Sequence, residues 1–348
     1  MDIVNVLLMP GGGPGILAQL AALKSSTKYR SRAILADANP ASGNLFLPEV
    51  DAAYRMPLCS DDGYLIALIR LIEREQIGVL YSGLDEELPV LARCRRSIEQ
   101  HGCRLLLPPA EALDCALDKG AMFARLDGLV RMPRTWMLND AFDADRVWAE
   151  LAGRVVVKVL SSRGGRKIYM PEDGDEYDFV LSRVRKQSAA TGERFLVQEL
   201  IEGEEFNVSS LHAPDGALVY AVSRRKFETR RMKSTTTAAV IERNDMMTEQ
   251  AVAAVEALGL VPGFNNVEAI VSRDDGLPYL IEVNGGRTAA QDMNLVAAGI
   301  NLTDLLIDLS HGRAVEAVAH PRDGIAILKI RKDVVVEYAD IAARVSVP

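Results

Sequence analysis

The sequence predicts a two-part fold: an α/β lobe built on a parallel sheet, followed by an α+β region whose sheet is largely antiparallel. In the first third of the chain, short apolar runs alternate with helical patterns, which is typical of βαβ units. From Phe195 onward β-rich runs predominate, with few helical patterns between them. The 348 residues are enough for two or three lobes of about 100 to 150 residues each.

The first third is expected to alternate strands and helices, because its apolar residues fall either in short runs or at helical spacing. The expected strands cover residues 4–9, 33–36 and 77–81, and the expected helices cover residues 15–24, 64–74 and 86–98.

The pattern changes after Pro108-Pro109, where two short helices are expected over residues 111–117 and 119–126, and Pro133 marks a boundary. The β-branched run Val155–Val159 leads into a glycine-containing loop and a second strand. Further strands are expected at 195–200, 206–211, 218–222, 267–271 and 279–283, and helices at 248–258 and 302–309.

Composition excludes several classes of protein. No apolar run approaches the roughly 20 residues that span a bilayer. The net charge of -8 argues against a nucleic-acid partner, which needs clustered positive surface. The start of the chain has no basic segment before its apolar run, so we expect a cytoplasmic protein. The four cysteines lack CxxC spacing and are interpreted as incidental.

A glycine cluster, Gly11–Gly15, follows the first expected strand, and Asp37 ends the second. This arrangement imitates a dinucleotide-binding turn, but the third glycine of GxGxxG would fall at Ile16. A glycine turn in a doubly wound sheet is therefore favoured over nicotinamide binding. A Walker A loop is absent from the sequence.

Glu282 and Asn284 lie two residues apart at the end of an expected strand, so they project to one face. A turn near Asp274-Asp275-Gly276 would bring Glu268 onto the neighbouring strand. Three oxygen-bearing side chains then converge, and oxygen ligands are those that magnesium prefers. The alternative is that both glutamates are ordinary solvent-facing strand residues.

Lys158 ends a buried-looking run of valines, where a charge is costly unless it meets an anion such as phosphate. Lys119 is less distinctive, and by spacing alone it could lie on a solvated helix face. The segment from Gln198 to Phe206 has four acids in a strand and turn. Such a linker can offer backbone groups to an adenine edge and a carboxylate to ribose, although an acidic turn is the simpler interpretation.

Basic residues gather between Arg224 and Lys233, where guanidinium groups can make bidentate contacts with a carboxylate or phosphate. We expect Arg225 from this segment, together with Arg287, to contact the reacting groups. A solvated loop whose charges only aid solubility is the alternative.

These motifs, in this order, resemble the ATP-grasp superfamily, specifically the branch similar to the synthetase halves of the carbamoyl phosphate synthase large subunit. The resemblance implies a Rossmann-like N-terminal lobe over residues 1–110, a small subdomain with a glycine-rich lid over 111–195, and a C-terminal subdomain with the metal site over 196–348. Many relatives read acid-x-Asn-x-Arg, whereas Arg287 here comes one residue later. A carbamoyl phosphate synthase needs two synthetase halves and this chain holds one, so that product is not expected.

The resemblance also implies roles for individual residues. Magnesium, with manganese as an alternative, would be held by Glu268, Glu282 and Asn284. Arg287 stands near the family's arginine position and is expected to be catalytic, together with Arg225, which is inferred from the basic segment and not from the resemblance. ATP would be bound by Lys119, Lys158, Ser161, Gly164, Gly165, Gln198, Glu199, Leu200, Ile201 and Glu205.

The implied reaction is ATP-dependent activation of a small carboxylate as an acyl phosphate, followed by attack of an amine. The expected partners are therefore a small acid and an amine, and a homodimer is the commonest form for a soluble oligomer. Two alternatives stay open: a phosphotransferase or carbamoyl-phosphate-like enzyme that needs no amine, and a regulator that binds ATP without turnover.

Overall fold

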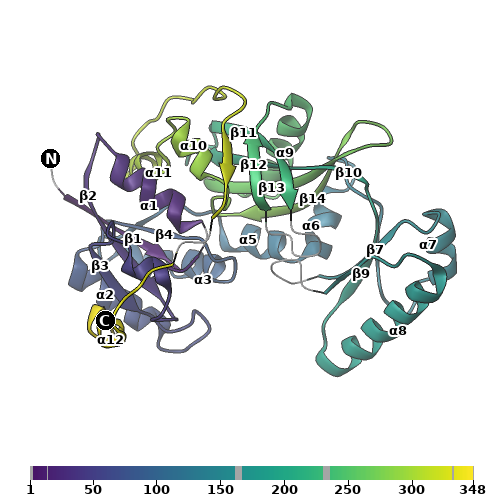
Figure 1. Cartoon of the computed structure of the whole chain (residues 1–348), viewed down its shortest axis with the longest axis horizontal. Helices are drawn as coiled ribbons and strands as arrows, with labels where there is room; N and C mark the ends of the chain where they lie inside the picture. The colour runs from purple at the N-terminus through teal and green to yellow at the C-terminus, as the bar shows by residue number, and fades with distance from the viewer. Residues whose placement is uncertain (1–2, 14, 161–166, 230–235, 331–332, 348) are drawn as a thin grey trace.

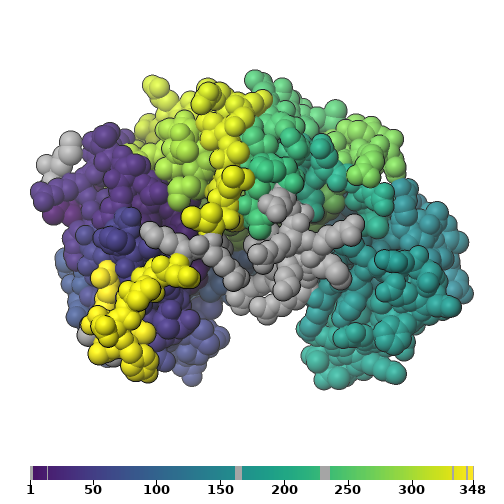
Figure 2. Space-filling view, in the orientation of Figure 1, coloured from purple at the N-terminus to yellow at the C-terminus, as the bar shows by residue number. Residues whose placement is uncertain are grey.

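Three β-sheets organise the chain in the computed structural model, which describes residues 3–13, 15–160, 167–229, 236–330 and 333–347 (Figure 1). One sheet lies in an N-terminal lobe, a six-stranded sheet lies in the centre, and a four-stranded sheet lies in a smaller lobe at the far end. Figure 2 shows the N-terminal lobe and the small lobe standing apart on either side of the central region.

The N-terminal sheet has the strand order β16-β3-β2-β1-β4-β5 and all its pairings are parallel. This confirms the predicted parallel-sheet lobe. The chain order reverses at β1, whose neighbours are β2 and β4, so the loops after β1 and β4 flank the crevice where doubly wound sheets bind ligands. Its elements are β1 (Ile3–Met9), α1 (Ile16–Ser25), β2 (Arg30–Asp37), η1 (Gly43–Phe46), β3 (Ala52–Arg55), α2 (Tyr64–Glu75), β4 (Val79–Ser82), α3 (Glu87–Arg93), α4 (Arg95–Glu99) and β5 (Arg104–Leu105).

The small lobe packs two helices against a sheet of order β6-β9-β7-β8. Its core includes Val155, Val157 and Val159 of one strand and Val180 and Val184 of the long helix. The connecting helices α5 (Ala110–Leu117) and α6 (Lys119–Leu126) precede it. The elements of this lobe are β6 (Thr135–Met137), α7 (Ala144–Glu150), β7 (Val155–Val159), β8 (Ile168–Tyr169), α8 (Gly174–Thr191) and β9 (Phe195–Glu199).

The central sheet is antiparallel throughout, with the order β14-β13-β10-β11-β12-β15. This agrees with the predicted antiparallel character of the second half. Helix α9 packs on one face with buried residues such as Met247 and Ala251. The elements are β10 (Gly203–His212), β11 (Leu218–Thr229), β12 (Thr236–Ile241), α9 (Asp245–Ala257), β13 (Gly263–Ser272), β14 (Pro278–Gly285), α10 (Met293–Ala297), α11 (Leu302–Ser310) and β15 (Ala326–Leu328).

The sheets divide the chain differently from the expected boundary at residue 195. Strand β9 pairs with β6 and β7, so it belongs to the small lobe, because its hydrogen bonds go to that sheet rather than to the central one. The segment 200–202 then forms the link to β10.

The end of the chain also departs from the expected single C-terminal subdomain. After β15 the chain returns to the N-terminal lobe, where α12 (Tyr338–Arg344) leads to β16 (Val345–Ser346), which pairs with β3 (Figure 1, yellow). We call residues 325–346 the C-terminal segment.

None of the helices in the described ranges is long and apolar enough to cross a bilayer.

Candidate active site

Two carboxylates lie side by side on the β13–β14 hairpin. Glu268 and Glu282 are directly opposite each other in the register, and Asn284 is opposite Asn266. Opposed residues of an antiparallel pair project to the same face, so these side chains share one patch. The tight turn between the strands contains Gly276 at a φ of 70°, a left-handed conformation that glycine adopts without strain. The structure thus brings together the three residues that the sequence suggested for a metal.

Lys119, the first residue of helix α6, reaches Glu282 on β14. Its Nζ lies 3.0 Å from Glu282 Oε1. Asp118 caps the start of helix α6 by accepting hydrogen bonds from the backbone N–H groups of Gly120 and Ala121 at 2.9 and 3.1 Å, which fixes the adjacent lysine. Burial raises the pKa of Glu282, but the positive charge of Lys119 outweighs it and the pKa falls below its ordinary value.

Lys226 holds the second carboxylate. It forms an ion pair with Glu268, and Glu205 Oε2 lies 3.6 Å from its Nζ. Asn266 Nδ2 donates a further hydrogen bond to Glu268 Oε1 at 2.8 Å. The side chain of Lys226 is 7% exposed; burial alone would lower its pKa, and the nearby carboxylates raise it instead. Glu205, expected among the ATP-binding residues, therefore lies beside the metal-site carboxylate Glu268.

Lys226 was not among the site residues predicted from the sequence, although the alternation of side chains along an expected strand could have indicated it. Arg224 and Lys226 alternate with Arg225 along β11, so they point to the opposite face from it. Arg224 pairs with Asp292 at 2.6 Å on the face that carries Lys226, whereas Arg225 pairs with Glu242 at 2.8 Å on the other face. The structure does not bring Arg225 to the carboxylate cluster, because strand alternation turns it to the other side of the sheet.

Lys158 lies in the small lobe on β7 and is 9% exposed. Within the described part of the chain it has no hydrogen bond or ion pair, and its Nζ lies 5.8 Å from the centre of the Phe123 ring. Burial lowers the pKa of Lys158 to about 8; Glu282 opposes this shift and Lys119 adds to it. A buried cation with this environment is suited to an anionic ligand.

The link between the small lobe and the central sheet contains the expected nucleotide-binding residues. Gln198 is buried and donates to Thr135 Oγ1 at 2.7 Å, and Glu199 pairs with Arg134 at 3.2 Å. The backbone N–H of Leu200 donates to Arg154 O at 2.9 Å. For Ile201 the described residues offer neither its N–H nor its C=O a backbone partner. Among the described residues, this link therefore offers one backbone donor and one backbone acceptor without a backbone partner, both on Ile201.

Arg287 joins the carboxylate patch to the N-terminal lobe. Its Nη2 donates to Asn284 Oδ1 at 3.0 Å, and the guanidinium forms an ion pair with Asp85 in the loop after β4. The additional residue in the Asn284–Arg287 spacing is accommodated by Gly286 at a φ of 81°. The chain thus turns back, and the arginine reaches the asparagine despite the longer spacing. Burial lowers the pKa of Arg287, but Asp85 more than offsets this effect.

The glycine turn after β1 is held by Asp37. Its Oδ2 accepts from Gly12 N at 2.6 Å and its Oδ1 from Asn39 N at 2.8 Å. A Cβ on Gly12 would lie 2.5 Å from Ser42 Oγ, so this turn needs glycine. Both oxygens of Asp37 stabilise the loop itself, in agreement with the interpretation as a structural turn.

Neither the predicted glycine-rich lid nor the cavity found in the structure contributes a described residue to the site around Glu268 and Glu282. Ser161, Gly164 and Gly165 lie outside the described residues. The described residues form no cluster of three or more histidine, cysteine, aspartate or glutamate side chains suited to a metal, so any cation held by the two glutamates needs additional oxygen ligands.

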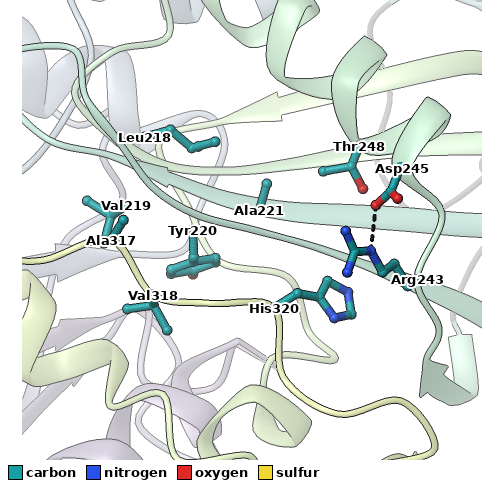
Figure 3. Close-up of a pocket in the computed structure, with 10 residues that line it drawn as sticks. All are labelled: Leu218, Val219, Tyr220, Ala221, Arg243, Asp245, Thr248, Ala317, Val318 and His320. Carbon is teal, nitrogen blue, oxygen red and sulfur yellow. Dashed lines mark hydrogen bonds and ion pairs between the residues drawn. The ribbon is translucent and has the colours of Figure 1, made fainter.

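A separate cavity of about 260 Å³ lies beside the start of β11, where Arg243 pairs with Asp245 and His320 points inward (Figure 3). It shares no residue with the lysine–carboxylate cluster.

The two carboxylates of the hairpin pair with Lys119 of helix α6 and Lys226 of the same sheet, and the buried Lys158 lies in the sheet of the small lobe. This arrangement fits an ATP-dependent ligase-type enzyme. The chain belongs to the ATP-grasp superfamily: residues 116–290 match a family model described as an ATP-grasp domain, and residues 7–106 match one described as a PylC-like N-terminal domain. ATP-grasp domains bind ATP with magnesium, and the enzymes of this family are typically ATP-dependent ligases.

Individual relatives agree with this assignment. A carbamoyl phosphate synthase large chain from Deinococcus radiodurans is 22% identical over 363 positions, which cover 94% of this chain and 34% of the relative. The chain thus spans about a third of that relative's length. Biotin carboxylase from Campylobacter jejuni has a similar fold, with a TM-score of 0.71, 19% identity, and coverage of 90% of this chain and 72% of the other. An L-amino acid ligase from Bacillus licheniformis has a TM-score of 0.63, 16% identity, and coverage of 89% and 74%.

Proposed function

We propose that the protein is a carboxylate-amine ligase, which uses ATP and magnesium to convert a small carboxylate into an acyl phosphate and then joins it to an amine. The observation that carries this proposal is the charge arrangement of the cleft. Glu268 and Glu282 are each held by a lysine, while the buried Lys158 forms no ion pair with the described residues. Carboxylates for a metal and a cation for phosphate are therefore available together.

The donor set fits magnesium. Glu268, Glu282 and Asn284 offer hard oxygen atoms from adjacent positions of one hairpin, and phosphate oxygens of ATP are the usual additional ligands. Magnesium, when bound, offsets the negative charge that phosphoryl transfer concentrates on the phosphate oxygens. Manganese has similar ligand preferences and is expected to substitute for it.

The protein's own groups position the nucleotide. Lys119 and Lys158 would bind phosphate oxygens, because both lie within electrostatic reach of Glu282 and Lys158 is buried without an ion pair among the described residues. The free N–H and C=O of Ile201 would meet the adenine edge, since a base edge presents a matching donor and acceptor. Gln198, Glu199 and Leu200 would support this link through their contacts with Thr135, Arg134 and Arg154.

A carboxylate becomes a useful electrophile only when it carries a better leaving group than oxide, and the terminal phosphoryl group of ATP provides one. The resulting acyl phosphate must be kept from water until the amine attacks. Arg287, which is fixed by Asp85 and Asn284 beside the carboxylate pair, would supply a cation near the developing charge. No covalent bond to the protein is required.

The test is release of ADP and phosphate with magnesium present, using a panel of amino acids and small carboxylates supplied singly and in pairs. The variant Glu282→Gln removes one metal-site charge, and Glu316→Gln is a matched control at an exposed position. We expect turnover that requires an acid and an amine together, that is lost in Glu282→Gln and that is retained in Glu316→Gln.

Other outcomes identify the alternatives. Phosphate transfer to an acid without any amine would indicate a phosphotransferase or carbamoyl-phosphate-like enzyme. ATP binding without turnover for any pair would contradict the ligase proposal and indicate a regulatory protein.

A further inference from the structure

The C-terminal segment adds a sixth strand to the central sheet. Strand β15 pairs with β12 so that Ile327 lies opposite Ala239 and Leu328 opposite Ala238. The pairing continues for one more residue, because Lys329 N donates to Thr237 O at 2.8 Å. Lys329 therefore has a fixed position at the edge of the sheet.

Strand alternation gives the direction of the Lys329 side chain. Leu328 and Ile330 are 69% and 84% exposed, so the residues between and before them point to the opposite face. Ile327 lies opposite Ala239, and Ala239 lies opposite Lys226 on β11. Directly opposed residues share a face, so Lys329 projects to the face that carries Lys226 and its partner Glu268.

The charges on this face are unevenly compensated. Arg224 is paired with Asp292 and Lys226 with Glu268. Lys329 is half-buried and has neither a hydrogen bond from its side chain nor an ion pair within the described ranges. Burial and the neighbouring Lys226 lower the pKa of Lys329, and Glu268 offsets this only in part. A partly desolvated cation in such surroundings is stabilised by an anionic ligand.

The position of Lys329 distinguishes between two anionic ligands. The nucleotide-binding candidates Lys119 and Ile201 lie at Glu282 on β14 and at the link before β10. Lys329 approaches Glu268 from the opposite edge of the sheet, beyond β11 and β12. The anion it meets is therefore on the far side of the carboxylate pair from the nucleotide.

We propose that Lys329 binds the anionic group of the acid substrate, first its carboxylate and then the acyl phosphate, so that the C-terminal segment completes the active site. This inference rests on the proposed function. In the transfer step a carboxylate oxygen forms the new bond to phosphorus while the bond from phosphorus to the bridging oxygen of ADP breaks. Lys329 supplies positive charge and exchanges no proton.

The test measures binding of acetyl phosphate, a small acyl phosphate, to protein saturated with MgADP, by calorimetry. Lys329→Met keeps the side-chain volume and removes the charge, Lys329→Arg keeps the charge, and Leu328→Ala perturbs the same strand on its exposed face. Loss of one charged contact is expected to weaken acetyl phosphate binding about tenfold in Lys329→Met. Lys329→Arg should restore most of it, Leu328→Ala should match the wild type, and MgADP affinity should stay within about twofold in all variants.

Three results would overturn the inference. Equal acetyl phosphate affinity in wild type and Lys329→Met, or no binding to the wild type, means that Lys329 does not meet this anion. A parallel loss of MgADP affinity means that it serves the nucleotide. An equal loss in Leu328→Ala means that the segment acts only through folding.

The outcome is separable from that of the proposed function. Turnover of an acid and an amine with charge-independent acetyl phosphate binding would reject only the role of Lys329. Binding that depends on Lys329, without turnover for any pair, would reject only the ligase activity.

Discussion

Arg287 and Asp85, 202 residues apart in the sequence, form an ion pair that joins the carboxylate hairpin to the N-terminal lobe, with Arg287 Nη2 lying 3.2 Å from Asp85 Oδ2. The same nitrogen donates to Asn284 Oδ1. The orientation of a metal-site residue therefore depends on a residue of another sheet. Both side chains are mostly buried, at 19% and 22% exposure, so solvent screens this pair only in part.

Replacing Asp85 by asparagine should destabilise the protein and misplace Arg287. The substitution leaves a mostly buried guanidinium without its counter-charge, and we expect the free energy of unfolding to fall by about 1.5 to 3 kcal/mol. Denaturant unfolding measures this loss. Asp62→Asn, at an exposed position, is the matched control, and an equal effect of the two substitutions would show that the ion pair contributes nothing.

Replacing Glu282 by glutamine should raise the magnesium requirement. The amide keeps the shape and can still accept from Lys119, but it is a much weaker ligand for a hard cation than a carboxylate. We expect the magnesium concentration for half-maximal turnover to rise at least about tenfold, as for loss of a ligand group. Initial rates across a magnesium titration test this, and removal of the metal by EDTA should stop turnover reversibly. An unchanged magnesium dependence would place the metal elsewhere.

ATP binding should take up protons near pH 8. The pKa of Lys158 is lowered to about 8, so the amine is about half protonated at that pH in the free protein. Phosphate oxygens favour the charged amine and raise its pKa, so binding should take up about half a proton at pH 8 and almost none near pH 6.5. Calorimetry in buffers of different ionisation enthalpy measures this number.

Lys158→Arg is the control for proton uptake, because arginine stays charged throughout this range. The variant should bind ATP with no pH-dependent uptake. If it took up as many protons as the wild type, another group would be responsible.

Acid should destabilise the fold through His212. This side chain is fully buried, neither ring nitrogen has a hydrogen-bond partner in the described structure, and Glu256 Oε1 lies 3.9 Å away. Burial lowers the pKa of His212, and Glu256 opposes this shift incompletely. Below its ordinary value of about 6.5 the unfolded chain binds the proton first, so stability falls as the pH falls. The drop in melting temperature between about pH 7.5 and 5.5 should be smaller in His212→Leu than in the wild type. Equal drops would mean that other groups carry the acid sensitivity.

The carboxylate patch was predictable because its determinants are local. Glu268 and Glu282 are joined by a short hairpin whose turn residues fix the register, and alternation then decides the face. The same holds for Lys158, whose burial follows from the valines around it. The parallel sheet of the first lobe was also predictable, because short apolar runs alternate there with helical spacing of apolar residues.

Other parts of the fold and site depend on contacts between distant segments. Asp85 acquires its role only when the N-terminal lobe meets the β13–β14 hairpin that carries Arg287. Lys226 acquires its role only when β11 and β13 lie in one sheet, on either side of β10. Strand β9 could not be assigned to its sheet without knowing its partners β6 and β7. Helix α8 was missed because its sequence is largely polar, with only a narrow buried stripe that includes Val180 and Val184.

The C-terminal segment has a consequence for the order of assembly during synthesis. Strand β1 precedes every other strand described here and β16 follows them all, yet the two belong to the same sheet, with β3 and β2 between them. A domain that folds as it leaves the ribosome can use only the residues already made. The N-terminal lobe must therefore wait for residues 345–346 before its outer strand is in place, after the central sheet and the small lobe have been synthesised.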